Sequence, residues 1–284
     1  MNLAGKIGLL SFLMSNIALG VYAQSINDST HKDGTVKPLI STAPKPVYRP
    51  KPKGPKPIHR ELSLGLRLNT DGWGIFIDRG TVIYENIKTA DLFYRFKLWQ
   101  LDFDEKKDPR EMKSTSTNQS ATGGSSTNSY IYGKINNFYT LKLGLGTSKM
   151  IAGKPDPGSV SIHWVITGGL SLGLLKPYYI NTTYNGVAQA IKYTDQTKDA
   201  FLDPTNIDGS AGFSQGLSET KIVPGAHLKT GLHFDFSGNR RTLLAAEVGM
   251  NVEYYSSPIQ IMAENTGVPY FFNLYAALQF GRRW

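Results

Sequence analysis

The stretch AHLKTGLHFDF, residues 226–236, decides the fold class of this chain, because apolar and polar side chains alternate along it. Leu228 and Leu232 fall on one side of an extended backbone, and His227 and Lys229 fall on the other. Such period-two alternation predicts a β-strand with one apolar face. A strand needs about 9–11 residues to cross a bilayer at a tilt, whereas strands of soluble proteins usually have about 5–6. This stretch has the length of a membrane-crossing strand.

The same alternation recurs in seven other segments, so eight strands are expected in all. The other seven span residues 61–69, 72–83, 91–103, 137–147, 160–174, 244–255 and 272–284. Two architectures fit this pattern. In a soluble β-sandwich the apolar faces meet in a core, whereas in a membrane barrel they face lipid and the polar faces line the interior.

Three further features favour the barrel. The connections alternate in length, and the two longest ones, near 104–136 and 175–222, fall at the same end. Glycines repeat on the polar face, where they leave room for large charged neighbours inside a small barrel. The last alternating strand ends at an aromatic residue, Trp284, as in substrates of the outer-membrane barrel-assembly machinery. We therefore expect an all-β fold, an eight-stranded antiparallel transmembrane β-barrel over residues 60–284, with both termini on the periplasmic side of a bacterial outer membrane.

The first 23 residues read as a secretory signal peptide. Lys6 supplies the positive charge, an apolar stretch follows, and Val21 and Ala23 give the small residues that precede a cleavage site. A membrane anchor is the alternative, but the apolar stretch is shorter than the roughly 20 residues that a spanning helix needs.

Residues 24–59 predict a disordered, extended arm. Eight Lys and Arg residues against two Asp residues give the segment from Gln24 to Arg60 a charge of +6, and prolines alternate with the basic residues in its second half. Proline fixes φ and removes an amide donor, so this segment joins neither a helix nor a central strand. It is either a spacer or a docking peptide for a periplasmic or outer-membrane protein. The docking interpretation assigns partner binding to Lys45, Arg49, Lys51, Lys53 and Lys56. Nucleic acid is not an expected partner of an exported chain.

The predicted barrel interior is just wide enough to be filled by side chains, because eight strands enclose little space. Charged groups inside must then pair, since unpaired buried charges are costly. A lumen charge network is predicted from Arg67, Lys142, Lys229, Asp235, Glu247, Glu253 and Arg283. Arg95, Lys97, His163, His227 and His233 are placed inside by the same alternation. The network is either a structural plug or the lining of a narrow ion path.

Four blocks resemble a family of Bacteroidota-type outer-membrane β-barrel proteins: RLNTDGW (67–73), YIYGKINNFY (130–139), GGLSLGLLKPYY (168–179) and QFGRRW (279–284). The resemblance covers residue 60 to the end and excludes the arm. It implies a small outer-membrane barrel and brings no established activity. The block KDPRE, residues 107–111, departs from the Lys-His-Pro-Lys-Glu of that family at Asp108, which argues against a metal role there.

Neither an enzyme nor a cofactor is expected. The chain has no cysteine, which excludes thiol nucleophiles and cysteine-ligated metals, and its histidines share no motif with a serine. Asp203 and Asp208 suggest calcium, but Pro204 occupies a ligand position of the EF-hand pattern, so no metal site is predicted. The expected lipid partners are outer-membrane lipid and lipopolysaccharide, whose phosphates Lys106, Lys107, Arg110 and Lys113 are placed to meet.

The sequence thus favours a non-enzymatic barrel that serves as a structural or adaptor component of an envelope complex, of the secretion or barrel-assembly type. A narrow ion or small-solute channel is the alternative. A hydrolase or acyltransferase acting at the barrel rim is the third hypothesis, and it requires a serine or aspartate beside a histidine.

Overall fold

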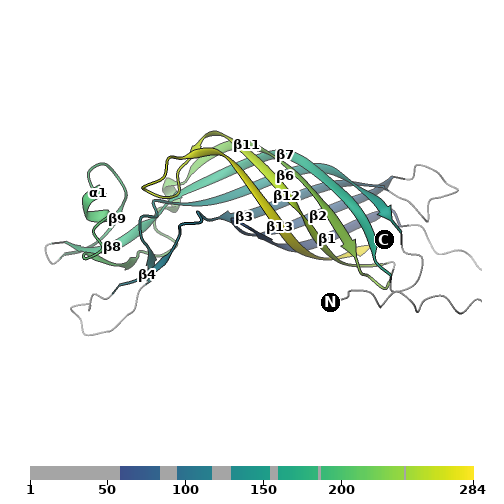
Figure 1. Ribbon diagram of the computed structural model, residues 1–284, viewed down its shortest axis with the longest axis horizontal. Coiled ribbons are helices and arrows are strands. Elements are labelled where there is room, and N and C mark those ends of the chain that lie inside the picture. The colour runs from purple at the N-terminus through teal and green to yellow at the C-terminus, as the bar shows by residue number, and fades with distance from the viewer. Residues whose placement is uncertain (1–57, 84–94, 117–128, 154–158, 185–186, 240) are drawn as a thin grey trace, which may run out of the picture. The chain divides into compact units, whose positions relative to one another are not determined.

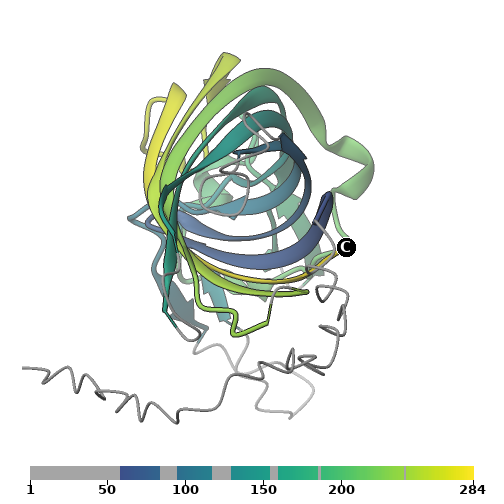
Figure 2. The ribbon, with the colours of Figure 1, turned by 90° about the vertical axis from the view of Figure 1, so that its right-hand side faces the viewer.

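Eight long antiparallel strands close into a barrel (Figures 1 and 2). The computed structural model describes residues 58–83, 95–116, 129–153, 159–184, 187–239 and 241–284. The barrel strands are β1 (Arg60–Asn69), β2 (Gly72–Ile83), β3 (Arg95–Lys106), β6 (Asn136–Ala152), β7 (Ser161–Pro177), β11 (Lys221–Asp235), β12 (Thr242–Ile259) and β13 (Val268–Arg283). The predicted eight-stranded antiparallel barrel is confirmed. The predicted signal peptide and nearly all of the predicted arm lie outside the described residues.

Each barrel strand pairs with the next one along the chain, and the first pairs with the last. The closing register runs from Glu61 opposite Arg283 to Asn69 opposite Tyr275. Closure leaves no barrel strand with an unpaired edge, so the backbone donors and acceptors of the wall are satisfied within it. Within the described part of the chain, no helix has the length and apolar character needed to cross a membrane.

Burial is reversed relative to a soluble protein. Outward positions of the wall carry large apolar side chains, as Leu68, 70% exposed, and Leu170, 71% exposed, illustrate. Inward positions carry buried polar and charged groups, such as Lys229 and Glu247. A soluble sandwich would show the opposite arrangement, so the apolar band of this wall matches a lipid-facing surface.

The beginning of β3 reverses the expected facing. The sequence pattern placed Arg95 and Lys97 inside, but both lie on the outward side of β3, where Lys97 is exposed, while Phe96 and Leu98 are buried inside. Phe96 and Leu98 pack with Val165 of β7 in an apolar cluster. The pattern misleads here because apolar groups fill this end of the interior, so Arg95 and Lys97 take the outward side.

The two longest connections share one end of the barrel, as predicted, although the shortest connection lies at that end too. The turn at 70–71 and the segments 107–135, 178–220 and 260–267 share one end, here called the loop end. The segments 84–94, 153–160 and 236–241 share the opposite end, called the terminal end. There the Arg60 amide donates to the Trp284 carbonyl at 2.9 Å, so both ends of the barrel wall meet at the terminal end.

The two longest connections carry secondary structure of their own at the loop end (Figure 1). A hairpin joins β4 (Lys113–Thr115) to β5 (Ser129–Ile131), and a three-stranded sheet has β8 (Tyr179–Tyr184) between β9 (Val187–Lys192) and β10 (Ile207–Ser210). Two short helices, α1 (Lys198–Phe201) and η1 (Leu217–Glu219), complete this lobe. Its buried core is formed by Tyr130, Ile135, Ile180, Phe201 and Ile207. Side chains from both connections therefore pack together.

Candidate functional site in the barrel interior

The interior of the barrel holds a dense network of buried charged side chains. All seven residues of the predicted charge network are at most 5% exposed there: Arg67, Lys142, Lys229, Asp235, Glu247, Glu253 and Arg283. They come from five different strands, and the alternation of each strand turns them to the same side of the wall. Their arrangement forms three groups along the barrel.

The group nearest the terminal end is centred on Arg283. Its guanidinium donates to Glu61 at 2.5 Å and to Asp235 at 2.6 Å. The backbone amide of Ser237 donates to Asp235 at 2.8 Å. Strands β1, β11 and β13 are therefore tied together inside the barrel by one bridging cation. Charge-assisted bonds of this kind are stronger than neutral ones.

The central group contains two ion pairs and two aromatic rings. Arg67 donates to Asp102 at 2.9 Å, and both side chains are 2% exposed. The guanidinium carbon of Arg67 lies 4.5 Å from the ring centroid of Phe76 and 5.0 Å from that of Tyr275. Cations over aromatic faces gain electrostatic attraction that partly compensates for lost hydration.

Glu247 forms the second centre of that group. Its carboxylate lies 3.3 Å from the Lys229 ammonium and 3.3 Å from Nδ1 of His233, and it accepts a hydrogen bond from the Tyr275 hydroxyl at 2.8 Å. Three groups from two strands, β11 and β13, therefore surround one buried carboxylate of β12. Such a fully used acceptor stabilises the wall and leaves little freedom for rearrangement.

The group toward the loop end is centred on Glu253. Its carboxylate lies 3.0 Å from the Lys142 ammonium and 3.2 Å from that of Lys106, and it accepts a 2.6 Å hydrogen bond from the Tyr255 hydroxyl. Lys142 also pairs with Asp104, and Lys106 with Asp71 at 2.8 Å. Acidic and basic groups thus alternate across the lumen, as the predicted pairing requires.

The sequence placed Lys106 among the cations available to lipopolysaccharide, and the structure corrects this. Lys106 is 1% exposed, and its ammonium is directed into the lumen toward Asp71 and Glu253. It lies at the end of β3 on the same face as Asp102 and Asp104. Lys107, Arg110 and Lys113 remain exposed.

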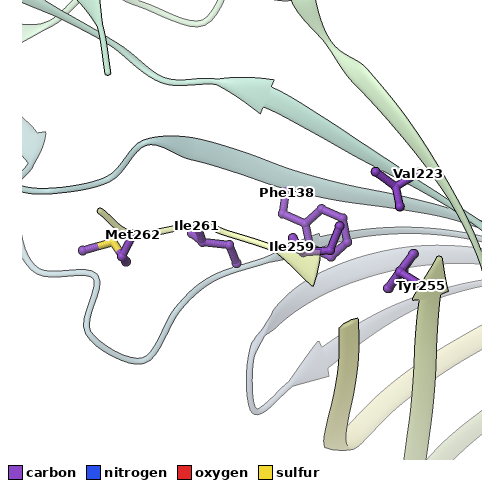
Figure 3. Close-up of a cluster of buried hydrophobic side chains, with 6 residues drawn as sticks. All are labelled: Phe138, Val223, Tyr255, Ile259, Ile261 and Met262. Atoms are coloured by element: carbon purple, nitrogen blue, oxygen red, sulfur yellow. The ribbon is translucent and has the colours of Figure 1, made fainter. Parts of the chain in front are cut away.

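An apolar cluster covers the charge network at the loop end (Figure 3). It consists of Phe138, Val223, Tyr255, Ile259, Ile261 and Met262. Phe138 lies edge-to-face with Tyr255 at 5.3 Å between ring centroids, and it stacks on Phe271 at the same separation. This cap shields the ion pairs around Glu253 from the loop end.

A small cavity of about 10 Å³ lies among the described residues at the terminal end of the lumen. Its lining includes Glu61, Asp78, His163, His233 and Arg283. A single water needs about 10–15 Å³ on the same measure, so this space holds at most one water molecule. The interior at this level is filled by side chains.

Sequence reasoning missed a part of the network in which amides surround Asp78. Asp78 accepts hydrogen bonds from the Gln100 amide at 2.6 Å and from the Gln279 amide at 3.0 Å. Gln279 also donates to Ser63 at 2.5 Å. Glutamines and serines occupy inward positions of the same alternating pattern as the charged residues. The pattern therefore contained the information needed to place them in the lumen.

Two histidines have serine neighbours, which bears on the rim-enzyme hypothesis. Ser171 lies 3.0 Å from Nδ1 of His227, but Nε2 of His227 has no hydrogen-bond partner within the described residues. His163 lies 3.5 Å from Ser148 and 3.4 Å from Ser161, both long contacts. All of these groups are buried inside the barrel rather than at its rim. The rim-enzyme hypothesis requires a serine or aspartate beside a histidine at the rim, and these pairs do not lie there.

The acidic residues of the long connection also have local partners. Asp203 accepts hydrogen bonds from Thr205 and Asn206, which hold the pKa of its carboxyl below the ordinary value. Asp208 accepts a 2.6 Å bond from Thr183. In the ranges that the structure describes, no three His, Asp or Glu side chains converge as a metal site.

No family model and no curated protein sequence matches this chain. Among solved structures, it is similar to Neisserial surface protein A, with 8% identity over 80% of this chain and 95% of that one, at a TM-score of 0.34. It is also similar to the attachment invasion locus protein Ail of Yersinia pestis, with 9% identity over 81% of this chain and 100% of that one, at a TM-score of 0.35. The N-terminal β-barrel domain of Pseudomonas aeruginosa OprF has 9% identity over 80% of this chain and 100% of that domain, at a TM-score of 0.33. The fold assignment rests on the strand pairing of this chain itself.

Proposed function

We propose that this protein is a non-enzymatic barrel of a bacterial outer membrane that serves as an anchor or adaptor in an envelope complex. In this proposal the lipid-facing wall holds the chain in the membrane, and both termini are periplasmic. The basic, proline-rich arm then docks a periplasmic partner, while the folded lobe of the loop end faces outward. In this proposal the complex is of the secretion or barrel-assembly type.

The observation that carries the proposal is the filled lumen. Three groups of buried ion pairs bridge the strands, and an apolar cap covers them at the loop end. Transport needs a path through the interior, whereas anchoring needs only a stable wall. A barrel whose interior is filled by ion pairs is better suited to anchor other segments or partner proteins than to let solutes pass.

Planar-bilayer recording distinguishes the anchor from the channel alternative. We expect the purified full-length chain to produce no stable, reproducible conductance steps, because side chains occupy the lumen from the Arg283 group to the Phe138 cap. An open barrel of the same preparation method serves as the positive control. Reproducible unitary steps from this chain would support the narrow-channel alternative instead.

The docking role of the arm is tested by affinity purification from detergent-solubilised outer membranes. Deletion of residues 36–58 removes Lys45, Arg49, Lys51, Lys53 and Lys56 and leaves the barrel strands intact. We expect this variant to lose the periplasmic proteins that co-purify with the unaltered chain. A matched variant replaces the five basic residues by glutamine and keeps the length of the arm. It therefore distinguishes a requirement for the positive charge of the arm from a requirement for its length. If every co-purifying protein stays with both variants, the arm is a spacer.

A further inference from the structure

The outer surface of the terminal end carries a ring of cations that the proposed function does not use. Arg60, Arg79, Lys97, Lys149 and Arg282 are all exposed, and the inward neighbours that flank them on their strands are buried or nearly so. They come from β1, β2, β3, β6 and β13, which are consecutive around the barrel. These five residues are called the basic belt.

The strand register places four of the five belt residues in two pairs. Arg79 and Arg282 lie opposite Leu62 from its two sides, and Lys97 and Arg60 lie opposite Thr81 in the same way. Adjacent strands are about 4.8 Å apart, so the two cations of each pair start roughly 10 Å apart on the wall. Long Arg and Lys side chains span that distance, and both members of a pair can reach one anion.

Aromatic residues mark the depth of the belt in the membrane. Trp99 lies opposite Arg79, and Trp164 lies opposite Lys149. Both indoles are about half exposed on the outer wall. Tryptophan gathers at the boundary between hydrocarbon and headgroups, where its ring is partly buried and partly wet. The belt therefore lies at headgroup level.

The belt has no acidic neighbours on the outer surface among the residues that the structure describes. The described acids of the terminal end, Glu61, Asp78 and Asp235, are all buried in the lumen. The exposed cations of the loop end, by contrast, are mixed with exposed acids, as the pair formed by Lys192 and Glu219 shows. Within the described ranges of the chain, the exposed charges at the terminal end are therefore of one sign, which favours an external anion as their partner.

We propose that the basic belt binds the phosphate groups of glycerophospholipid headgroups in the periplasmic leaflet, with a preference for anionic phospholipids. The inference rests on the proposed membrane location, which puts the terminal end in that leaflet. Arginine binds phosphate through paired donors and lysine through a point charge, and Thr81 adds a hydroxyl between one pair of bases. The bound lipids form a fixed ring around the end of the barrel from which the arm leaves.

Native mass spectrometry of the full-length chain in mixed phosphatidylcholine and phosphatidylglycerol nanodiscs tests this proposal. The belt variant combines Arg79→Gln, Lys97→Gln, Lys149→Gln and Arg282→Gln. The control variant combines Arg110→Gln, Lys113→Gln, Lys198→Gln and Lys221→Gln, which remove the same charge from exposed positions of the loop end. Circular dichroism of both variants checks that the barrel forms.

We expect the unaltered chain and the control variant to retain phosphatidylglycerol in preference to phosphatidylcholine. In the belt variant the ratio of retained phosphatidylglycerol to phosphatidylcholine should fall at least about fivefold, which is the effect of one basic residue near an anionic surface. Added salt should weaken the preference of the unaltered chain, which gives a second readout if the belt variant does not fold. Equal retention by all three chains would overturn the belt as a lipid site, as would a preference that only the control variant loses. In a second set of nanodiscs that also contains lipopolysaccharide, a belt-dependent preference for lipopolysaccharide would also overturn the proposal, because it would place the terminal end in the outer leaflet. Failure of the unaltered chain to enter nanodiscs would instead contradict the proposed function.

Discussion

Replacing Asp102 by asparagine is expected to lower the free energy of unfolding of the barrel by about 3–5 kcal/mol, because it leaves a buried cation without its counter-ion. Arg67 makes its one ion pair in the described chain with Asp102, and both groups are 2% exposed. Asparagine keeps the volume of the side chain and removes only the charge. Urea unfolding from lipid vesicles, followed by tryptophan fluorescence, measures the loss.

A second variant separates the ion pair from simple repacking. Combining Asp102→Asn with Arg67→Met removes both charges, and we expect this double variant to be more stable than Asp102→Asn alone. Glu219→Gln is the exposed control, because Lys192 and Glu219 are 38% and 40% exposed, and it should change the unfolding curve little. If Asp102→Asn matched that control, the central pair would contribute nothing to holding the wall together.

The facing of most strands was predictable because each position of β11, β12 and β13 meets one of two opposite environments. Residues 226–236 have no inward position that favours lipid and no outward position that is charged. The same rule placed the network residues, such as Glu247 and Lys229, inside. This part of the fold can be predicted from the sequence because a charged side chain on the lipid-facing side is costly.

The partners inside the lumen were not predictable from that rule. Arg67 is on β1 and Asp102 is on β3, and their contact depends on how far the strands are staggered around the barrel. Alternation determines whether a side chain faces the lumen or the outer surface, but it does not determine the position of the residue along the barrel axis. The prediction for the start of β3 was wrong for a related reason. Lys97 lies near the end of its strand, where an outward-facing charge costs less than it does at the middle of a membrane wall.

The lobe at the loop end carried no periodic signal at all. Its core joins Tyr130 and Ile135 from one connection to Ile180, Phe201 and Ile207 from another, so no local segment contains the pattern. In the small sheet, β10 pairs with β8 across the intervening β9 and α1, so this pairing is also not contained in one local segment. Contacts of this kind are set by closure of the barrel, which brings the two connections to one end.

Replacing Leu228 by arginine tests the lipid-facing wall most directly. Leu228 is the middle residue of β11 and is 55% exposed on the outer surface. An arginine at the bilayer midplane is expected to cost about 2–4 kcal/mol of unfolding free energy, and at the interface about 0–1 kcal/mol. Phe236→Arg is the matched control, because Phe236 is exposed just after the same strand at the terminal end. Unfolding from phospholipid vesicles should therefore show a large loss for Leu228→Arg and a small one for Phe236→Arg. In a soluble protein with a water-exposed wall, arginine would be tolerated equally at both positions, and that result would contradict the membrane location from which the anchor, the arm and the basic belt all take their orientation.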